Sequence, residues 1–265
     1  MEGGVIASEA RGLTLWEHLN ELVRRLRVIF IAVVISSLFM MIFPVSLDII
    51  PNSVNPWYPT PTTFVIRKLQ QDFLPAGVTV IPISLFAPIE VYIVVSLMLG
   101  ILVSLPVIAY ELYRFIYPAL HENEKKLINI FILSFLVLFA AGFSIGYFFV
   151  TPASIRVLLL FSQFVGLPSI YGFTEILWLV VGSLLVCGFI LTLPIYVNLL
   201  VRAGILKTQT VTKNRRYIYP LIIIGIALID PDPTVITETL IGLPLIILIE
   251  VSIIISKRFE KTRLK

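Results

Sequence analysis

Six apolar segments divide this 265-residue chain, and its basic residues fall on alternate connections between them. Of the 20 Lys and Arg residues, all but three lie before the first segment, after the last one, or on the second and fourth connections. Apolar segments of about 20 residues can cross the hydrocarbon core of a bilayer. Because basic residues are retained on the cytoplasmic side, the pattern predicts a multi-pass protein of the cell (plasma) membrane with six transmembrane helices and both termini in the cytoplasm.

The predicted spans give an all-α integral membrane protein, with crossings at residues 28–50, 89–110, 128–150, 174–201, 217–229 and 235–255. Prolines within or at the ends of these spans bend or interrupt helices, and bent helices predict a concave bundle. These prolines are Pro106, Pro194, Pro220 and Pro244. The fifth span reaches only about 20 Å, against roughly 30 Å of hydrocarbon. We therefore expect it to thin the bilayer or to shelter behind its neighbours.

The flanking segments have distinct compositions. Residues 1–27 are predicted to form a cytoplasmic N-terminus with an amphipathic helix lying along the inner membrane surface, opened by a capping box of Thr14 and Glu17. Residues 28–256 form the predicted membrane domain, and residues 257–265 a basic cytoplasmic tail. The proline-rich connection 51–88 contains a short amphipathic stretch near 63–73, and we expect it to cap the outer ends of the spans.

Composition excludes a soluble globule, because 58% hydrophobic and 14% charged residues leave too little polar surface for a chain of this length. The net charge of +4 comes from basic residues at span ends, where they hold topology and meet anionic lipid headgroups, so we expect no nucleic-acid binding. Cys187 is the only cysteine, which excludes an intrachain disulfide.

No motif predicts an enzyme or a cofactor. Gly142, Ser144 and Gly146 match the G-x-S-x-G pattern of serine hydrolases, but both histidines of the chain are predicted to be cytoplasmic and no base is near this serine. The same two glycines spell G-x-x-x-G, which favours close helix packing in lipid. His121 and Glu122 begin a zinc pattern that Lys125 breaks, so no metal site is predicted.

Glu238 is one of few charged residues at membrane depth. Two interpretations stay open at this point: an interfacial group that reaches water, or a polar anchor for a partner helix. A secondary transporter of a small solute is the alternative function, and it predicts inverted repeats with polar groups converging at the midplane. We find no such repeat in the sequence.

Four stretches of sequence carry a family resemblance: HLNELVRRL at 18–26, LPVIAYELYRFIYPALHENEKK at 105–126, GFSIGYFFVTPAS at 142–154 and IDPDPTVITETLIGLPLIILIE at 229–250. Together they resemble the TatC family, the multispan receptor subunit of the twin-arginine protein translocase. The resemblance extends over nearly the whole chain.

The resemblance implies that the cytoplasmic face binds the twin-arginine signal peptides of folded export substrates through Glu21 and Glu124. A guanidinium presents a planar fork of donors that a carboxylate accepts bidentately, so two arginines require two separated acids. Phe115 and Pro118 are expected to shape the docking surface for the apolar part of the signal. Arg25 is expected to keep the acids ionised and in place.

The resemblance also implies partners. We expect single-span TatA/TatB-type subunits in an oligomeric complex within the lipid, driven by the transmembrane proton gradient (proton motive force). Many relatives carry an acidic residue just before the proline that matches Pro194, where this chain has Thr192. Glu238 is expected to supply the missing polar group, and with Thr192 and Thr237 to contact the partner subunits.

Overall fold

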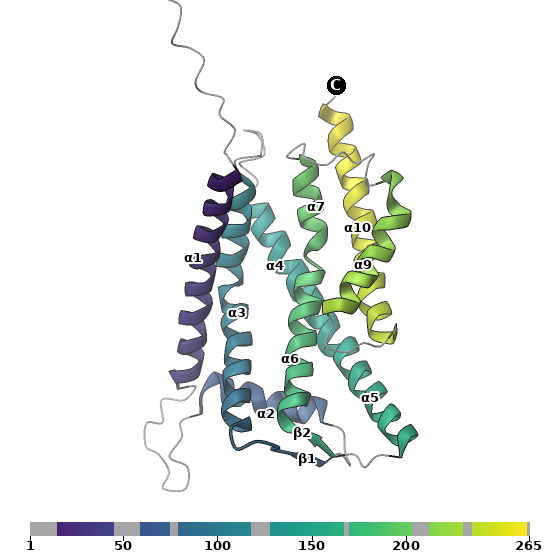
Figure 1. Ribbon diagram of the computed structural model, residues 1–265. Helices are drawn as coiled ribbons and strands as arrows, with labels where there is room; N and C mark the ends of the chain where they lie inside the picture. Colours follow the sequence, from purple (N-terminus) through teal and green to yellow (C-terminus); the bar gives the residue numbers. More distant parts are fainter. Residues whose placement is uncertain are drawn as a thin grey trace, which may run out of the picture.

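The computed structural model describes residues 15–44, 59–74, 79–117, 128–166, 170–202, 212–229 and 235–263. These residues form long helices packed side by side, with two three-residue strands at one end (Figure 1). The elements in chain order are α1 (Leu15–Ile42), α2 (Pro61–Phe73), β1 (Thr79–Ile81), α3 (Ala87–Ile116), α4 (Ile128–Ile145), the π-helix η3 (Gly146–Val150), α5 (Thr151–Val165), β2 (Ile170–Gly172), α6 (Phe173–Ile190), α7 (Leu193–Arg202), α9 (Arg215–Ile229) and α10 (Val235–Arg263).

Within these ranges, four helical runs are long and apolar enough to cross a membrane: Leu19–Ile42, Ala87–Phe115, Ile128–Val165 and Phe173–Leu199. They confirm an all-α membrane fold and correspond to the first four predicted spans. The 15 residues of α9 and the 29 residues of α10 lie where the fifth and sixth spans were predicted. The count of six crossings stays a prediction. The first turn of α1 and the last turns of α10 lie at the same end of the bundle (Figure 1).

The first helix differs from the sequence prediction in its boundaries. α1 continues from the amphipathic turns into the apolar ones as one helix of 28 residues, so residues 15–27 belong to the same helix as the first span. Between Leu15 and Ile42 there is no proline or glycine to interrupt the hydrogen-bond ladder. The three arginines Arg24, Arg25 and Arg27, which looked like a boundary, lie inside the helix. The first span consequently ends at Ile42 rather than near residue 50.

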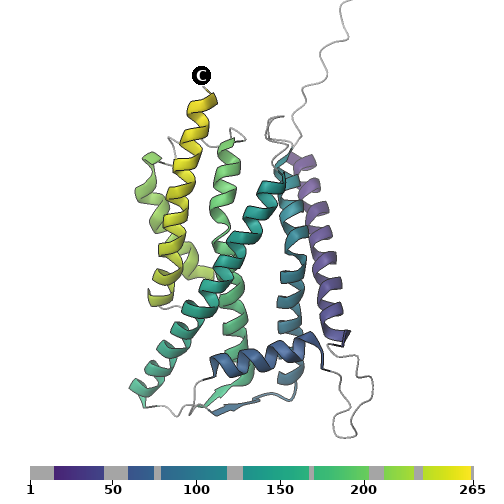
Figure 2. The ribbon, with the colours of Figure 1, turned by 180° about the vertical axis from the view of Figure 1, so that it is seen from behind.

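The third run crosses the bundle obliquely as α4, η3 and α5 (Figures 1 and 2). In η3 the ladder widens, because the N–H of Thr151 bonds to the carbonyl oxygen of Gly146, five residues earlier. A Cβ on Gly142 would lie 2.4 Å from the carbonyl oxygen of Cys187, and one on Gly146 would lie 3.1 Å from the Cys187 Cβ. The two glycines therefore let α4 and η3 pack directly on the backbone of α6, as the G-x-x-x-G pattern predicts.

The fourth run is broken where Pro194 was expected to interrupt it. α6 ends at Ile190 and α7 begins at Leu193, with Leu191 and Thr192 forming a turn between them. Thr192 donates to the carbonyl oxygen of Phe189 twice, from its backbone N–H at 3.0 Å and from Oγ1 at 2.6 Å, and these bonds close the turn. Pro106, Pro220 and Pro244 instead lie within continuous helices α3, α9 and α10.

A cap lies across one end of the bundle, built from α2 and the parallel strand pair of β1 and β2 (Figure 2). The predicted amphipathic stretch is α2, which begins with Thr60 as its N-cap and buries Leu69 and Phe73 against the spans. Thr62 donates to the carbonyl oxygen of Met40 at the end of α1, at 2.9 Å. Hydrogen bonds thus fix the cap to the first span.

Asp72 fixes the other end of α2. Its carboxylate accepts a hydrogen bond from the Tyr147 hydroxyl of η3 and pairs with Lys68 at 2.9 Å. The Tyr147 hydrogen bond, followed by the contact with Lys68, holds the pKa of Asp72 below its ordinary value. The cap is therefore joined to the π-helix of the third run as well as to α1.

At the opposite end, Glu250 joins α10 to α9. Its Oε2 lies 2.8 Å from Nη2 of Arg215, and its Oε1 accepts from the hydroxyl of Tyr219. A carboxylate within a largely apolar helix needs such partners, because an unpaired charge in lipid is costly. The pair holds the short α9 against the long α10.

Candidate functional site

A cluster of three charged side chains joins α1 to α3 at the end that the charge pattern assigns to the cytoplasm. Arg25 donates from Nε to Oε1 of Glu21 at 3.1 Å, and its Nη2 contacts the same oxygen. Its Nη1 donates to Oε2 of Glu111 on α3, also at 3.1 Å. The fractional exposures of the side chains are 14% for Arg25, 23% for Glu21 and 10% for Glu111.

Helix geometry explains how the cluster forms. Glu21 and Arg25 are four residues apart, which places them on one face of α1. The face is turned toward α3, because α1 packs along α3 and Gly100 leaves no side chain between α3 and Ser37. Glu111 lies near the last turn of α3, level with the first turns of α1. The Arg25 guanidinium therefore bridges two carboxylates, that of Glu21 four residues away in sequence and that of Glu111 86 residues away.

Two of the predicted signal-binding residues, Glu21 and Arg25, lie in this cluster. Phe115 is half-buried on α3 and lies four residues after Glu111, on the same face of the helix. Glu124 and Pro118 lie outside the described residues, so the expected pairing of Glu21 with Glu124 stays a prediction.

Sequence reasoning missed Glu111. It is a single acid in the apolar run that ends α3, and it is itself buried. Buried carboxylates are almost always paired, and the basic residues Arg24 to Arg27 are predicted at the same end of the bundle as Glu111. This argument could have indicated an ion pair between α1 and α3, but only if the two helices were known to be neighbours.

Of the predicted partner-contact residues, Thr192 is buried and Glu238 is half-buried. Thr192 is 1% exposed and lies inside the bundle at the α6–α7 break. Glu238 lies in the first turn of α10 and is half-buried. Thr237 belongs to the same turn, although its side chain lies outside the described residues. Contact of these residues with a partner stays a prediction.

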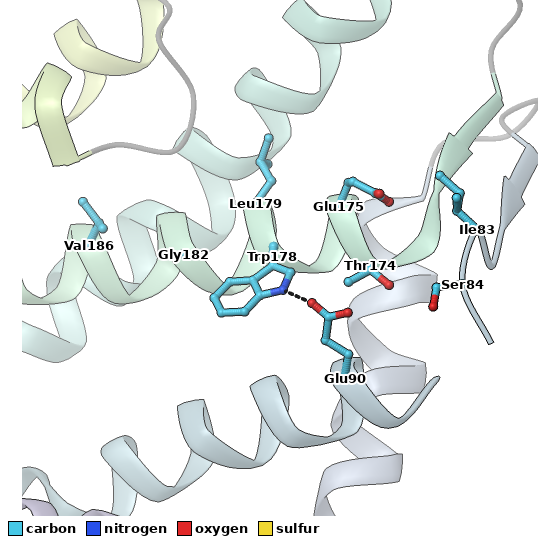
Figure 3. A pocket seen from close by; sticks show the side chains of 9 residues that line it. All are labelled: Ile83, Ser84, Glu90, Thr174, Glu175, Trp178, Leu179, Gly182 and Val186. Carbon is cyan, nitrogen blue, oxygen red and sulfur yellow. Dashed lines mark hydrogen bonds between the residues drawn. The ribbon is translucent and has the colours of Figure 1, made fainter. Parts of the chain in front are cut away.

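A pocket of about 610 Å³ opens between α3 and α6 near the cap, at the end opposite the charged cluster (Figure 3). The Trp178 indole donates from Nε1 to Oε1 of Glu90 at 2.9 Å across its mouth. Glu175 also lines it. Each acid lies in the first turn of its helix, where a negative charge stabilises the N-terminus. The acids therefore have structural roles that require no ligand.

Comparison with known proteins gives one family. The model of the family described as "Sec-independent protein translocase protein (TatC)" matches residues 17–244. The chain is 34% identical over 174 residues to Sec-independent protein translocase protein TatC of Desulforapulum autotrophicum, covering 65% of this chain and 63% of that protein. It is 28% identical over 247 residues to Sec-independent protein translocase protein TatCy of Bacillus subtilis, covering 92% of this chain and 89% of that protein.

A solved structure agrees with these sequence relatives. A crystal structure of the twin-arginine translocase receptor TatC superposes with a TM-score of 0.71 at 28% identity, covering 91% of this chain and 98% of that one. The family match extends from the first turns of α1 into α10, so it includes the cluster around Arg25 and the short α9. The chain belongs to the TatC family and is a membrane protein of Sec-independent, twin-arginine protein translocation.

Proposed function

We propose that the chain is the signal-peptide receptor of its translocase and that Glu21 binds one arginine of a twin-arginine signal. The observation that carries this proposal is the contact between Glu21 and Arg25, because this carboxylate already accepts a guanidinium through Nε and Nη2. Both bonds go to Oε1. A carboxylate has two oxygens with about four lone-pair sites, so Oε2 gives an incoming guanidinium its first contact before that guanidinium displaces Arg25 from Glu21.

The second arginine of the signal is assigned to Glu124, on the connection that follows α3. The two acids would then bind two adjacent guanidinium groups from the same aqueous side. Phe115 and Pro118 lie between Glu111 and Glu124 in sequence, and we assign them to the docking surface for the signal's apolar segment. Lysine carries no planar fork, so a Lys-Lys signal gives up the bidentate contacts.

The test is retention of signal peptides by the full chain in lipid nanodiscs. We expect an Arg-Arg peptide to bind at least about tenfold more tightly than its Lys-Lys counterpart, since charge-assisted bidentate bonds are lost. The Glu21→Gln variant should remove most of this difference. Glu90→Gln is the matched control, because Glu90 is an exposed acid at the other end of the bundle. Equal affinity of wild type for the two peptides would refute the receptor assignment.

We further propose that Glu238 and Thr237, in the first turn of α10, bind single-span TatA/TatB-type subunits. A half-buried carboxylate at a helix end within a membrane protein is tolerated when a polar partner satisfies it. Thr192 acts from inside the bundle, where its hydroxyl holds the turn that separates α6 from α7.

Replacing Glu238 by alanine is expected to reduce crosslinking to a single-span subunit several-fold, since the acid supplies a polar anchor in a region of low dielectric constant. Crosslinking yield and export of a reporter measure the effect together. Thr239→Ala, on the exposed side of the same helix, is the control. Unchanged crosslinking and export in Glu238→Ala would remove this residue from the interface.

A further inference from the structure

Glu111 has no role in the function proposed so far, although it is the least exposed of the three charged side chains around Arg25. It receives Nη1 of Arg25, while Glu21 receives the other two nitrogens. Two carboxylates thus share one guanidinium, and the cluster has a formal charge of −1. Arg24 and Arg27 are exposed to solvent, where screening weakens their effect on the cluster.

We propose that Glu111 is a positioning residue of the signal-binding site, and that it holds Arg25 when an incoming arginine takes its place on Glu21. This proposal rests on the receptor function proposed above. In the unbound chain Arg25 is divided between the two acids. When the signal's guanidinium binds Glu21, Arg25 remains on Glu111. The cluster then contains two carboxylates and two guanidinium groups, so every charge has a partner.

The cost of binding explains why the second acid matters. Arg25 lies four residues from Glu21 on the same helix, so it competes for that carboxylate as a tethered ligand at high effective concentration. A chain with only this pair would have to leave a poorly exposed Arg25 without a counter-ion each time a signal bound. An uncompensated charge in such a place is strongly unfavourable. Glu111 removes this penalty because its bond to Nη1 already exists before the signal arrives.

The same contact also positions Glu21. Because Nη1 is held by α3, the guanidinium plane of Arg25 is fixed between the two helices. Before a signal binds, Arg25 occupies Oε1 of Glu21 and orients the carboxylate. Glu111 therefore acts on the signal through Arg25 and does not touch it. Phe115 lies one helical turn further along α3, on the face that carries Glu111.

The pairing of charges in the cluster predicts peptide affinities for the single and double variants that differ from those expected of a salt bridge with only a structural role. Glu111→Gln should weaken binding of an Arg-Arg peptide about tenfold, since Arg25 then pairs with Glu21 alone. Adding Arg25→Gln to this variant frees Glu21 again and should restore affinity to within about threefold of wild type. A bridge that only held α1 on α3 would be lost equally in both variants, and the double variant would show no rescue.

The experiment measures the dissociation constant of a labelled Arg-Arg peptide for the full chain in nanodiscs, with a Lys-Lys peptide in parallel. Wild type, Glu111→Gln, Arg25→Gln and the double variant are compared, and the thermal midpoint of each is recorded. Weak binding of Glu111→Gln with recovery in the double variant supports the proposal. Unchanged affinity in Glu111→Gln, or a double variant at least as weak as Glu111→Gln, overturns it.

Two further comparisons cover the cases in which Glu111→Gln does not fold or the receptor function itself is wrong. If Glu111→Gln does not fold, the double variant is still informative, because it removes both partners of the Arg25–Glu111 pair and leaves neither of them as an unpaired charge. A tenfold loss of affinity for the Arg-Arg peptide in the double variant would contradict the proposal. Failure of the receptor function is distinguishable, since wild type would then bind both peptides equally. If wild type prefers the Arg-Arg peptide and Glu111→Gln does too, with unchanged affinity, only the role of Glu111 is wrong.

Discussion

Gly142→Leu will prevent the chain from reaching its folded state. A Cβ at this position would lie 2.4 Å from the Cys187 carbonyl oxygen and 3.0 Å from the Gly188 Cα, so the clash is with backbone that no side-chain rotation relieves. Gly188 marks a second close approach of the same two helices, because a Cβ there would lie 2.7 Å from the Phe139 ring of α4. Overpacking of one or two methylenes costs about 1–3 kcal/mol in a tight core, and leucine adds four carbons.

Gly225→Leu is the matched control for this prediction. Gly225 also lies in a helix, α9, but nothing lies within 4 Å of where its Cβ would be. There the substitution gains helix propensity of up to about 1 kcal/mol. Recovery of monodisperse protein after detergent extraction, with the thermal midpoint, measures both variants. Equal recovery and midpoints for Gly142→Leu and Gly225→Leu would show that close approach of α4 and α6 is not required.

Glu124→Lys is expected to abolish docking of an Arg-Arg signal, with a loss of at least about a hundredfold, because the change replaces an attractive charge with a repulsive one. The residue lies on a hydrophilic connection between spans, so insertion and the thermal midpoint should be unchanged. Binding of the labelled peptide to nanodiscs measures the first effect, and protease accessibility of the connection together with the midpoint measures the second.

The neighbouring acid provides the control for this charge reversal. Glu122→Lys changes the net charge of the same connection by the same amount, two residues away. A general electrostatic attraction to this surface would weaken equally in both variants. If Glu124 contacts the signal directly, peptide affinity should fall strongly in Glu124→Lys and only modestly in Glu122→Lys. Failure of Glu124→Lys to insert would instead mean that the residue has a structural role.

Hydropathy predicted the elements whose stability depends on lipid, and those predictions agree with the structure. The runs from Ala87 to Phe115 and from Phe173 to Leu199 are apolar over their whole lengths, and burial against lipid or other helices requires this. The amphipathic α2 was also predictable, because its apolar residues recur at helical spacing. The glycine pair in α4 indicated its packing face for the same local reason.

Features that depend on distant contacts could not be read from the sequence. The β1–β2 pair joins Thr79 to Ile170, and three-residue strands carry too short a pattern to be recognised. The π-helix at Gly146 has no sequence signature in a run of helix-compatible apolar residues. The sequence predicts the end of an amphipathic helix at Arg24 to Arg27, whereas α1 continues through these residues and Arg25 pairs with acids on two helices.

The cluster around Arg25 was predictable only in the part that is local in sequence. Glu21 and Arg25 are on one helix face, and their spacing can be counted. Glu111 belongs to the same cluster only because α1 and α3 are neighbours in space, which single-sequence periodicity does not encode.

The place of α1 in the bundle has a consequence for cargo size. This helix packs mainly along α3, and its outer side carries large exposed side chains such as Phe30 and Ile35. Glu21 is therefore at the rim of the molecule and not within an enclosed chamber. Under the proposed receptor function, a passenger that has already folded can remain in the aqueous phase while only its leading peptide reaches that rim. The dimensions of the bundle thus set no upper limit on what can be recognised.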